Sequence, residues 1–565
     1  MLHSKTVTTM KAIYNKIIVS AMVGAAGLTI GGCTNLDETI YSRLASEKYE
    51  FTDADLEATI APVYSSLRDV YWGWFGMADI MDESSDVWGV PNRIGIGWGD
   101  LYISMHKHEF NAGIGHFSVN WSNNYAGVNA CNQILANEQV ASSELIKAQV
   151  RAYRAMYYYN LFDLFRNIPL DTTFVHPDGW TPEQAAPEVT YKWIESELKE
   201  VADQCGDDIS LGKLSKYAAY MQLAKLYLNH DAWFPNNKDN SYYQKCIDCL
   251  NVIINSGKFA LATNYSDNFL EDISASPEII FGIVFENKYA GGNFMANLWI
   301  HNAGRARWNF SGWATGGGIV FPQFLDIYED GDTRLENTWT GGPQYAMDGS
   351  PILLDGEPLD YTRELHSIDN PGCYPMESWR LIKYEIKSGD YGTSYDDVPY
   401  YRYADALLMK AECLLRLGGY NGETEDDAAA LVTQVRARNF KADPSKAKVT
   451  AAQLKGGSKY NYGHRENTGE LGGEDNWVEN YQGGDDIEFG GLLDELAREF
   501  VCEAHRRDDI IRFTIKGTNM NVYCGKSWFC KDPEADRHTD IFPIPQDALD
   551  GNPKLKQNPG YTAAN

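Results

Sequence analysis

The sequence predicts a mostly α-helical fold in which paired helices form a curved scaffold that carries long loop-rich insertions and a few short strands. Three observations predict it. Apolar residues recur with the 3.6-residue spacing of amphipathic helices in several segments, and these segments lie in neighbouring pairs. Stretches rich in Gly, Pro, Asp and aromatic residues separate the pairs. A chain of 565 residues with 44% hydrophobic residues is long enough to bury a large core.

The N-terminus has the pattern of a secretory signal. Lysines but no acidic residues precede Cys33, and the apolar run 17–30 leads to Gly31-Gly32-Cys33. This pattern is similar to a bacterial lipoprotein signal, which is cleaved before the cysteine that receives the lipid. We therefore expect residues 1–32 to be a signal peptide and Cys33 to be a lipid tether, since two or more acyl chains hold a protein stably on a membrane. The alternatives are an ordinary signal peptide and a start at Met10 instead of Met1.

The next elements along the chain are predicted helices. Residues 150–166 form one, 216–229 and 242–255 form a pair, and 402–417 and 426–438 form another pair. Segment 216–229 is apolar nearly all round, so it should be buried. Small residues at crossing points and the paired arrangement resemble tetratricopeptide repeats, which build a curved wall with a large docking surface.

The helix predicted at 402–417 shows the pattern most clearly. One face collects its apolar side chains, and Gly418-Gly419 ends it; the face consists of Ala404, Leu407, Leu408, Ala411, Leu414 and Leu415.

Three regions differ from the helical segments in amino-acid composition. Residues 71–121, 258–400 and 455–490 are rich in Gly, aromatic residues and Asp, and the run 278–285 is typical of a strand. They are too long to be simple connections, which predicts functional insertions on the helical scaffold.

The ten cysteines do not describe a disulfide framework. Lipidation of Cys33 leaves an odd number at irregular spacing. Cys246 and Cys249 lie in a predicted helix, where two buried thiols are a better interpretation than a redox or zinc site. Cys524 and Cys530 are the best candidates for a disulfide, with two free thiols as an equal alternative.

The charge of the chain excludes one class of partner. A formal net charge of −29 and the lack of a basic stripe exclude nucleic acid, whose phosphates such a surface repels. After the signal, no stretch is apolar and long enough to cross a membrane, so we expect membrane attachment through the lipid alone.

Several ordered motifs resemble those of the SusD/RagB family of outer-membrane nutrient-binding lipoproteins of Bacteroidetes. They are RAYRAMYYYNLFDLFRNIPL at 151–170, VPYYRYADALLMKAE at 398–412, EFVCEAHRRDDIIRF at 499–513, FPIP at 542–545 and QNPGY at 557–561. Arg166-Asn167 replaces the more usual Phe-Gly step of the family. The resemblance extends from Cys33 to Tyr561.

The resemblance implies one domain over residues 33–565, with four tetratricopeptide-like helix pairs on one side. That side would contact a SusC-like TonB-dependent transporter, and loops on the other face would hold a glycan. The acids of Asp37-Glu38 resemble a signal for export to the outer face of the outer membrane. The motif charges should be buried ion pairs that fix the helices together; these are Arg402, Asp405, Arg506, Asp508 and Arg512.

Two insertions, near 71–121 and 285–315, contain the residue mixture that sugars need. Aromatic rings bury the C–H face of a sugar, and Asp, Asn and Arg bind its hydroxyl rim. The predicted ligand-binding residues are Asp82, Asp86, Trp88, Trp98, Asn302, Arg305, Trp308 and Trp313. The alternative is that most of these tryptophans fill the core beneath the loops.

Two competing functions remain. A glycoside hydrolase needs two facing carboxylates. Because the chain has 78 acidic residues, candidate pairs can always be chosen from the sequence, so they are not specific evidence for an enzyme, and no other catalytic motif is present. A helical-repeat adaptor for peptides would leave the tryptophan-rich insertions unexplained. We therefore predict a binding protein with no catalytic residue and no cofactor or metal ligand. A structural calcium ion is left as an alternative, although Asp330-Gly331-Asp332-Thr333 is only a fragment of a calcium loop.

Overall fold

The computed structural model describes residues 53–71, 75–93, 99–137, 140, 143–293, 295–389 and 394–562, which belong to one compact unit. The predictions for the signal peptide, Cys33 and Trp98 lie outside the described residues. No helix of the described residues is long and apolar enough to cross a membrane.

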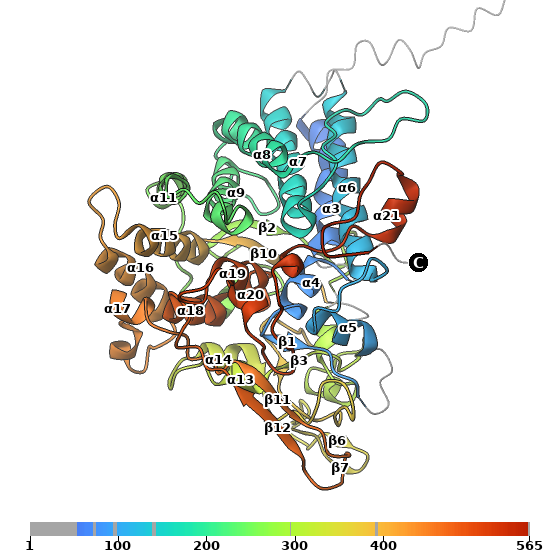
Figure 1. Ribbon diagram of the computed structural model, residues 1–565, viewed down its shortest axis with the longest axis vertical. Coiled ribbons are helices and arrows are strands. Elements are labelled where there is room, and N and C mark those ends of the chain that lie inside the picture. The colour runs from blue at the N-terminus through green and yellow to red at the C-terminus, as the bar shows by residue number, and fades with distance from the viewer. Residues whose placement is uncertain are drawn as a thin grey trace, which may run out of the picture. The chain divides into compact units, whose positions relative to one another are not determined.

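Eight helices form the scaffold. Each packs on the next in chain order, which gives four neighbouring pairs among the described residues (Figure 1). The helices are α3 (Asp53–Tyr71) with α6 (Gly115–Leu135), α7 (Glu144–Phe165) with α8 (Pro187–Val201), α9 (Lys216–Leu228) with α11 (Ser241–Ile254), and α15 (Tyr403–Leu417) with α16 (Glu425–Ala437). The five helices predicted from the sequence are confirmed, and a mostly α-helical fold with few short strands is confirmed with them.

Local sequence explains where these helices begin and end. Helix α9 is buried on nearly all sides, as its composition predicts, and the Ser215 hydroxyl caps its first turn. Thr424 and Asp427 form a reciprocal capping box at the start of α16. Helix α15 ends at Gly418, whose φ of 72° lies in the left-handed region that glycine adopts without strain.

The strands are short, and among the described residues they form antiparallel sheets of two strands each. The sheet nearest the scaffold joins β2 (Ile279–Ile283), which confirms the predicted strand, to β10 (Val398–Arg402), which leads directly into α15. The other pairs are β1 (Trp88–Gly89) with β3 (Ile319–Val320), β4 (Trp339–Thr340) with β9 (Arg380–Leu381), β5 (Gly342–Pro343) with β8 (Asp360–Tyr361), β6 (Leu353–Leu354) with β7 (Glu357–Pro358), and β11 (Gly463–Asn467) with β12 (Trp477–Tyr481).

Shorter helices fill the remaining chain. They are α4 (Met77–Glu83), α5 (Gly99–His106), α10 (His230–Trp233), α12 (Met295–Trp299), α13 (Pro322–Leu325), α14 (Arg334–Thr338), α17 (Ala451–Leu454), α18 (Gly490–Phe500), α19 (Arg506–Arg512), α20 (Val522–Gly525) and α21 (Gln546–Gly551), with 3₁₀ turns at Ala202–Gln204, Tyr265–Asn268, Ala303–Arg307 (η4), Pro444–Ala447 and His538–Asp540.

Two predicted loop regions contain more regular structure than expected. Region 71–121 holds α4, α5 and the start of α6, and region 455–490 holds the β11–β12 hairpin. Helices α4 and α5 were not predicted because each is only two turns long. Because they are packed from several sides, their apolar residues do not show the 3.6-residue spacing of an amphipathic helix.

Buried ion pairs hold the scaffold together, as the motif charges predict. The Arg402 guanidinium, just before α15, lies between the carboxylates of Glu278, Glu499 and Glu503 at 2.6–3.1 Å. Arg512 of α19 binds Glu412 of α15 at 2.7 Å. The remaining motif charges, Asp405, Arg506 and Asp508, also form ion pairs, with Lys225, Asp86 and Arg507 respectively.

Of the two alternatives for Cys524 and Cys530, the disulfide is wrong and two free thiols are confirmed. All nine described cysteines are buried and free. The Cys524 sulfur instead contacts the Thr539 hydroxyl at 3.3 Å and the Asp540 carboxylate at 3.2 Å. Cys246 and Cys249 are two buried thiols of α11, as the helical interpretation predicts.

Candidate functional site

The two insertions predicted to bind a ligand meet in the structure. Strand β1 of the first pairs with β3, which follows the second, so that Trp88 lies opposite Val320. The ring centroids of Trp88 and Trp299 are 4.9 Å apart. Arg93 of the first insertion also donates a hydrogen bond to the carbonyl of Gly316, the residue directly after the second insertion. Both insertions therefore belong to one region, and the strands β1 and β3 that join them lie below the centre of Figure 1.

The described residues predicted from the first insertion are buried. Asp82 accepts a hydrogen bond from the Ala504 amide at 3.1 Å. Asp86 forms an ion pair with Arg506 at 2.6 Å. Trp88 is fully packed in the core. A ligand cannot reach these three side chains without backbone movement, so we revise their predicted role from ligand contacts to support of the loops.

The environment of Asp82 differs from that of a paired carboxylate. Burial raises the pKa of Asp82 to about 7, and the Ala504 amide and the charge of Lys383 offset only part of that effect. Asp82 therefore holds a proton over much of the acidic range, which suits a carboxyl group inside the core.

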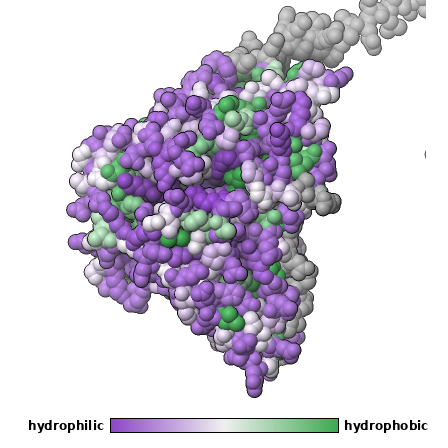
Figure 2. Space-filling model, viewed as in Figure 1, coloured by the Kyte–Doolittle hydropathy of each residue, from purple (hydrophilic) through white to green (hydrophobic). Residues whose placement is uncertain are grey.

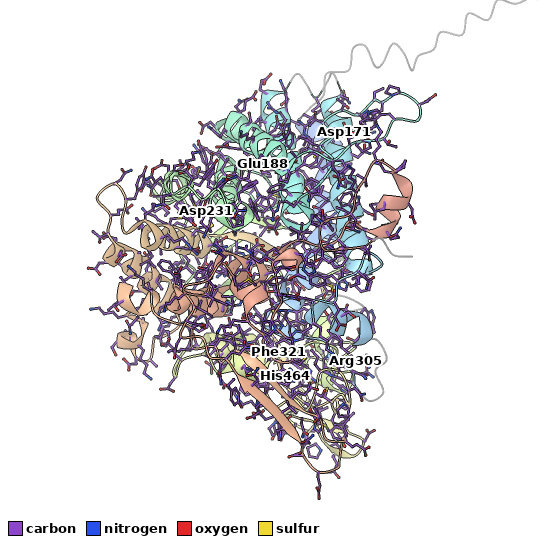
Figure 3. All side chains as sticks on the ribbon, in the orientation of Figure 1. Asp171, Glu188, Asp231, Arg305, Phe321 and His464 are labelled. Carbon is purple, nitrogen blue, oxygen red and sulfur yellow. The ribbon has the colours of Figure 1, made fainter. Side chains whose placement is uncertain are left out.

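The second insertion places its predicted residues at the surface. Arg305 is part of η4, and its guanidinium donates to the Asn302 carbonyl at 3.0 Å and to the Gly312 carbonyl at 2.7 Å. These two bonds close the segment 302–313 into a loop, whose position Arg305 marks in Figure 3. Asn302 is exposed at the start of this loop.

Two tryptophans are carried by the closed loop. Trp313 leaves 42% of its surface exposed, and Trp308 is half-buried. The Arg307 guanidinium lies 4.8 Å from the centroid of the Trp308 ring and is itself held by the Thr340 hydroxyl at 2.7 Å. Trp308 is thus fixed on one side, while Trp313 presents aromatic surface to solvent.

A second aromatic surface was missed from the sequence. On β12, Trp477, Glu479 and Tyr481 alternate with a period of two and therefore face the same side of the hairpin. Arg465 of β11 reaches over the Trp477 ring at 4.8 Å and lies 3.6 Å from the Glu479 carboxylate. The missed signal was this alternation, which follows a glycine-rich turn between two five-residue strands.

The segment 364–376 contacts both the loop and the hairpin. Met376 packs in a small apolar cluster with Ala303 of η4. Earlier in the chain than Met376, Glu364 forms an ion pair with Arg465 at 2.5 Å.

The molecular face seen in Figure 2 is mostly hydrophilic, with apolar residues in separate small patches rather than in one continuous area. Such a surface suits a polar ligand that is bound through individual aromatic rings.

A polar groove of about 450 Å³ lies on the other side of the hairpin. His464 of β11, labelled in Figure 3, lines it together with Lys107, Glu109, Glu466 and Glu534. The size is within the range of small-ligand sites, but no Phe, Tyr or Trp side chain lines the groove. It therefore provides groups for hydroxyls without a ring to cover the apolar face of a sugar.

The scaffold contains a smaller cavity of about 60 Å³ where α15 and α19 meet. Asp405, Asp509, Glu412 and Arg512 are among its lining residues. A space of this size holds only one or a few water molecules, so it does not qualify as a glycan site.

Comparisons with known proteins agree with this architecture. The model of the SusD family matches residues 261–561, which is more than half of the chain, and a model described as starch-binding associating with outer membrane matches residues 36–228. The starch-binding protein SusD of Bacteroides thetaiotaomicron is 23% identical over 454 residues, covering 74% of this chain and 72% of that protein. The SusD-like protein P2 of Formosa agariphila is 24% identical over 570 residues, covering 94% and 98%.

Solved structures show the same fold. The surface glycan-binding protein A from Bacteroides thetaiotaomicron, in complex with laminarihexaose, superposes with a TM-score of 0.65 at 19% identity, covering 90% of this chain and all of that one. A SusD superfamily protein from Parabacteroides distasonis superposes with a TM-score of 0.68 at 19% identity, with 90% and 100% covered.

Proposed function

Because the chain belongs to the SusD family, we propose that it is a glycan-binding lipoprotein of the cell surface. It captures an oligosaccharide or polysaccharide and delivers it to a SusC-like TonB-dependent transporter in the outer membrane. The observation that carries the proposal is the loop 302–313, where Arg305 holds two tryptophans at the surface.

The chemistry of this loop fits a sugar better than an apolar ligand. Trp313 offers a flat ring to the C–H face of a sugar, and the Asn302 amide offers donors and acceptors to its hydroxyls. The relatives named for starch and for laminarihexaose support this class of ligand, while the particular glycan is open.

A matched pair of variants tests the glycan site. Trp313 and Trp180 are exposed to 42% and 41%, but Trp180 lies between α7 and α8, stacked on His176 at 3.6 Å. We expect Trp313→Ala to lower glycan affinity about tenfold or more, as loss of a central aromatic contact does, whereas Trp180→Ala leaves it unchanged. Affinity electrophoresis over a polysaccharide panel finds the ligand, and calorimetry measures both variants. Equal affinities for wild type and Trp313→Ala would remove this loop from the site.

Membrane attachment is proposed through a lipid on Cys33, which lies outside the described residues. Radiolabelled palmitate should enter the wild-type protein and not a Cys33→Ser variant, and the variant should leave the membrane fraction. Protease accessibility on whole cells tests exposure at the outer surface.

The transporter partner is proposed to dock on the scaffold helices, since stacked helix pairs offer a wide surface. Purification of the protein from its native membrane in mild detergent should recover a TonB-dependent transporter. A complex that forms equally with Trp313→Ala would show that docking and glycan binding use different surfaces.

We also propose that the protein binds glycans without cleaving them. Incubation with each bound polysaccharide should release no reducing ends, whereas a hydrolase would release them continuously. Release that persists in the purified protein and is abolished by a single carboxylate substitution would establish the competing enzymatic function.

A further inference from the structure

A cluster of three titratable side chains lies where α4 packs near the start of α6. Asp79 and Glu83 are four residues apart on α4 and so point from the same face of the helix. His116 lies in the first turn of α6. Its Nε2 atom is 3.2 Å from Asp79 Oδ2 and 3.5 Å from Glu83 Oε2.

The three side chains are buried with few of the partners that buried charges need, although the Tyr102 hydroxyl donates a hydrogen bond to Asp79 Oδ2 at 3.3 Å. Glu83 and His116 are fully buried, and Asp79 nearly so. Neither oxygen of Glu83 accepts a hydrogen bond within the described part of the chain, and Asp79 Oδ1 accepts none either. In the same described part, no lysine or arginine forms an ion pair with Asp79 or Glu83.

Three buried glutamates in and next to α18 form ion pairs instead. Glu495 and Glu499 of α18 each form ion pairs with two or more arginines, and Glu503 with Lys383 and Arg402. Burial raises the pKa of Glu83 well above its usual range, and the charge of Asp79 raises it further. A carboxylate pair that faces one imidazole in the core is therefore stable only with an added proton or an added cation.

We propose that Asp79, Glu83 and His116 bind a divalent transition-metal ion, best matched by zinc. Ligand atoms at 2.0–2.1 Å from a tetrahedral ion lie about 3.3 Å from one another, close to the two separations observed here. A nitrogen ligand favours zinc and its neighbours over calcium and magnesium, which prefer oxygen. The second Glu83 oxygen is available as a further donor.

The site has a structural role. The ion would join α4 to α6, and α4 leads through Asp86 to Trp88 and β1, which supports the second insertion. Its ligands are closed off from solvent, so a glycan or a reacting molecule has no access to the ion. Metal binding and glycan binding are therefore separable properties.

Metal analysis of tag-free protein tests the proposal. After removal of metals with a chelator, the wild-type protein should take up about one equivalent of added zinc, and its Tm should rise with the free zinc concentration. Glu83→Gln keeps the shape of the side chain and should abolish the uptake and the rise in Tm. Asp82→Asn, on the same helix but outside the cluster, should keep both.

Cobalt distinguishes this cluster from the buried cysteines. The cobalt-loaded protein should show the d–d bands of nitrogen and oxygen ligands and no thiolate charge-transfer band in the near ultraviolet. A thiolate band, uptake by Glu83→Gln equal to that of wild type, or no uptake by wild type would each overturn the proposal. Glycan affinity measured in parallel shows separately whether the proposed function holds.

Discussion

Arg402 of the scaffold and three arginines of the loop-rich region are held by different kinds of partner. In the scaffold, Arg402 binds carboxylates that come from distant parts of the chain. In the loop-rich region, Arg93, Arg305 and Arg380 donate to main-chain carbonyls in the hydrogen bonds that the structure shows. Burial lowers the pKa of Arg380, and the charge of Arg93 lowers it further.

This difference shows what each kind of contact fixes. A pair between an arginine and a carboxylate joins two elements whose sequences are far apart, and it positions one helix on another. An arginine that donates to carbonyls fixes the path of one loop through its main chain, and this contact does not involve the other side chains of that loop. Two of the family motifs lie largely on the scaffold helices α7 and α15, and motif 499–513 is joined to these helices by ion pairs of α19, while the aromatic surfaces lie on a loop and on the hairpin.

The largest loss of stability is expected when the arginine at the centre of the buried charge network is replaced. Arg402→Met leaves Glu278, Glu499 and Glu503 buried with fewer cations, and we expect a loss of ~3–5 kcal/mol in the free energy of unfolding. Arg380→Met is the matched change in the loop-rich region. It leaves only carbonyls unpaired and should cost ~1–3 kcal/mol. Urea unfolding measures both, and equal losses would contradict the comparison.

The second prediction contrasts how the contributions of two buried carboxyl groups to stability depend on pH. Burial alone would raise the pKa of Glu278, but Arg438 and Arg402 outweigh it and lower that pKa to about 2. Its contribution to stability is therefore present above about pH 4.5 and is lost as the pH falls towards 2. Asp82, with a pKa raised to about 7, behaves in the opposite way: its contribution is full below about pH 4 and is lost as the pH rises to 7.

Asp82→Asn isolates the second of these effects. The variant has no proton to lose, so its stability relative to wild type should rise by ~2–3 kcal/mol between pH 5 and pH 7.5. Urea unfolding at both pH values measures the difference, in which the other titrating groups cancel. A relative stability that does not change with pH would mean that Asp82 is charged throughout this range.

The third prediction tests whether the hairpin belongs to the ligand surface. Trp477 and Val478 are neighbours on β12, exposed to 38% and 43% on opposite faces of the strand. We expect Trp477→Ala to lower glycan affinity up to about tenfold and Val478→Ala to leave it unchanged. Neither change should alter stability much, because both side chains are at the surface. A loss of affinity in Val478→Ala alone would assign the ligand to the groove side of the hairpin.

The scaffold was predictable because its signals are local. The apolar face of 402–417 and the glycine that follows it define α15 with no knowledge of its neighbours. Motif charges such as Arg402 and Arg512 were assigned to buried ion pairs from the cost of burying a lone charge, and their partners confirm it.

The candidate site was less predictable because exposure is a tertiary property. Trp88 and Trp313 are chemically alike and lie in similar sequence, yet one packs on Trp299 and the other faces solvent. Asp86 gave no sign that Arg506, distant in the chain, would be its partner. The hairpin aromatics were visible as an alternation, but its two strands are separated by a long glycine-rich turn that obscured the pairing.

The smallest effect on stability is expected at the loop that carries the proposed site. Arg305→Ala removes two hydrogen bonds to carbonyls of a half-exposed loop, so the loss should be at most ~1 kcal/mol. Arg363→Ala, which removes an exposed ion pair with Asp326, is the control and should cost still less. Glycan affinity should nevertheless fall severalfold in Arg305→Ala, because the loop must then be ordered at the expense of binding. Faster amide exchange over 302–313 in this variant would show the loosened loop directly, and unchanged exchange and affinity would mean that Trp308 and Trp313 are held by packing alone.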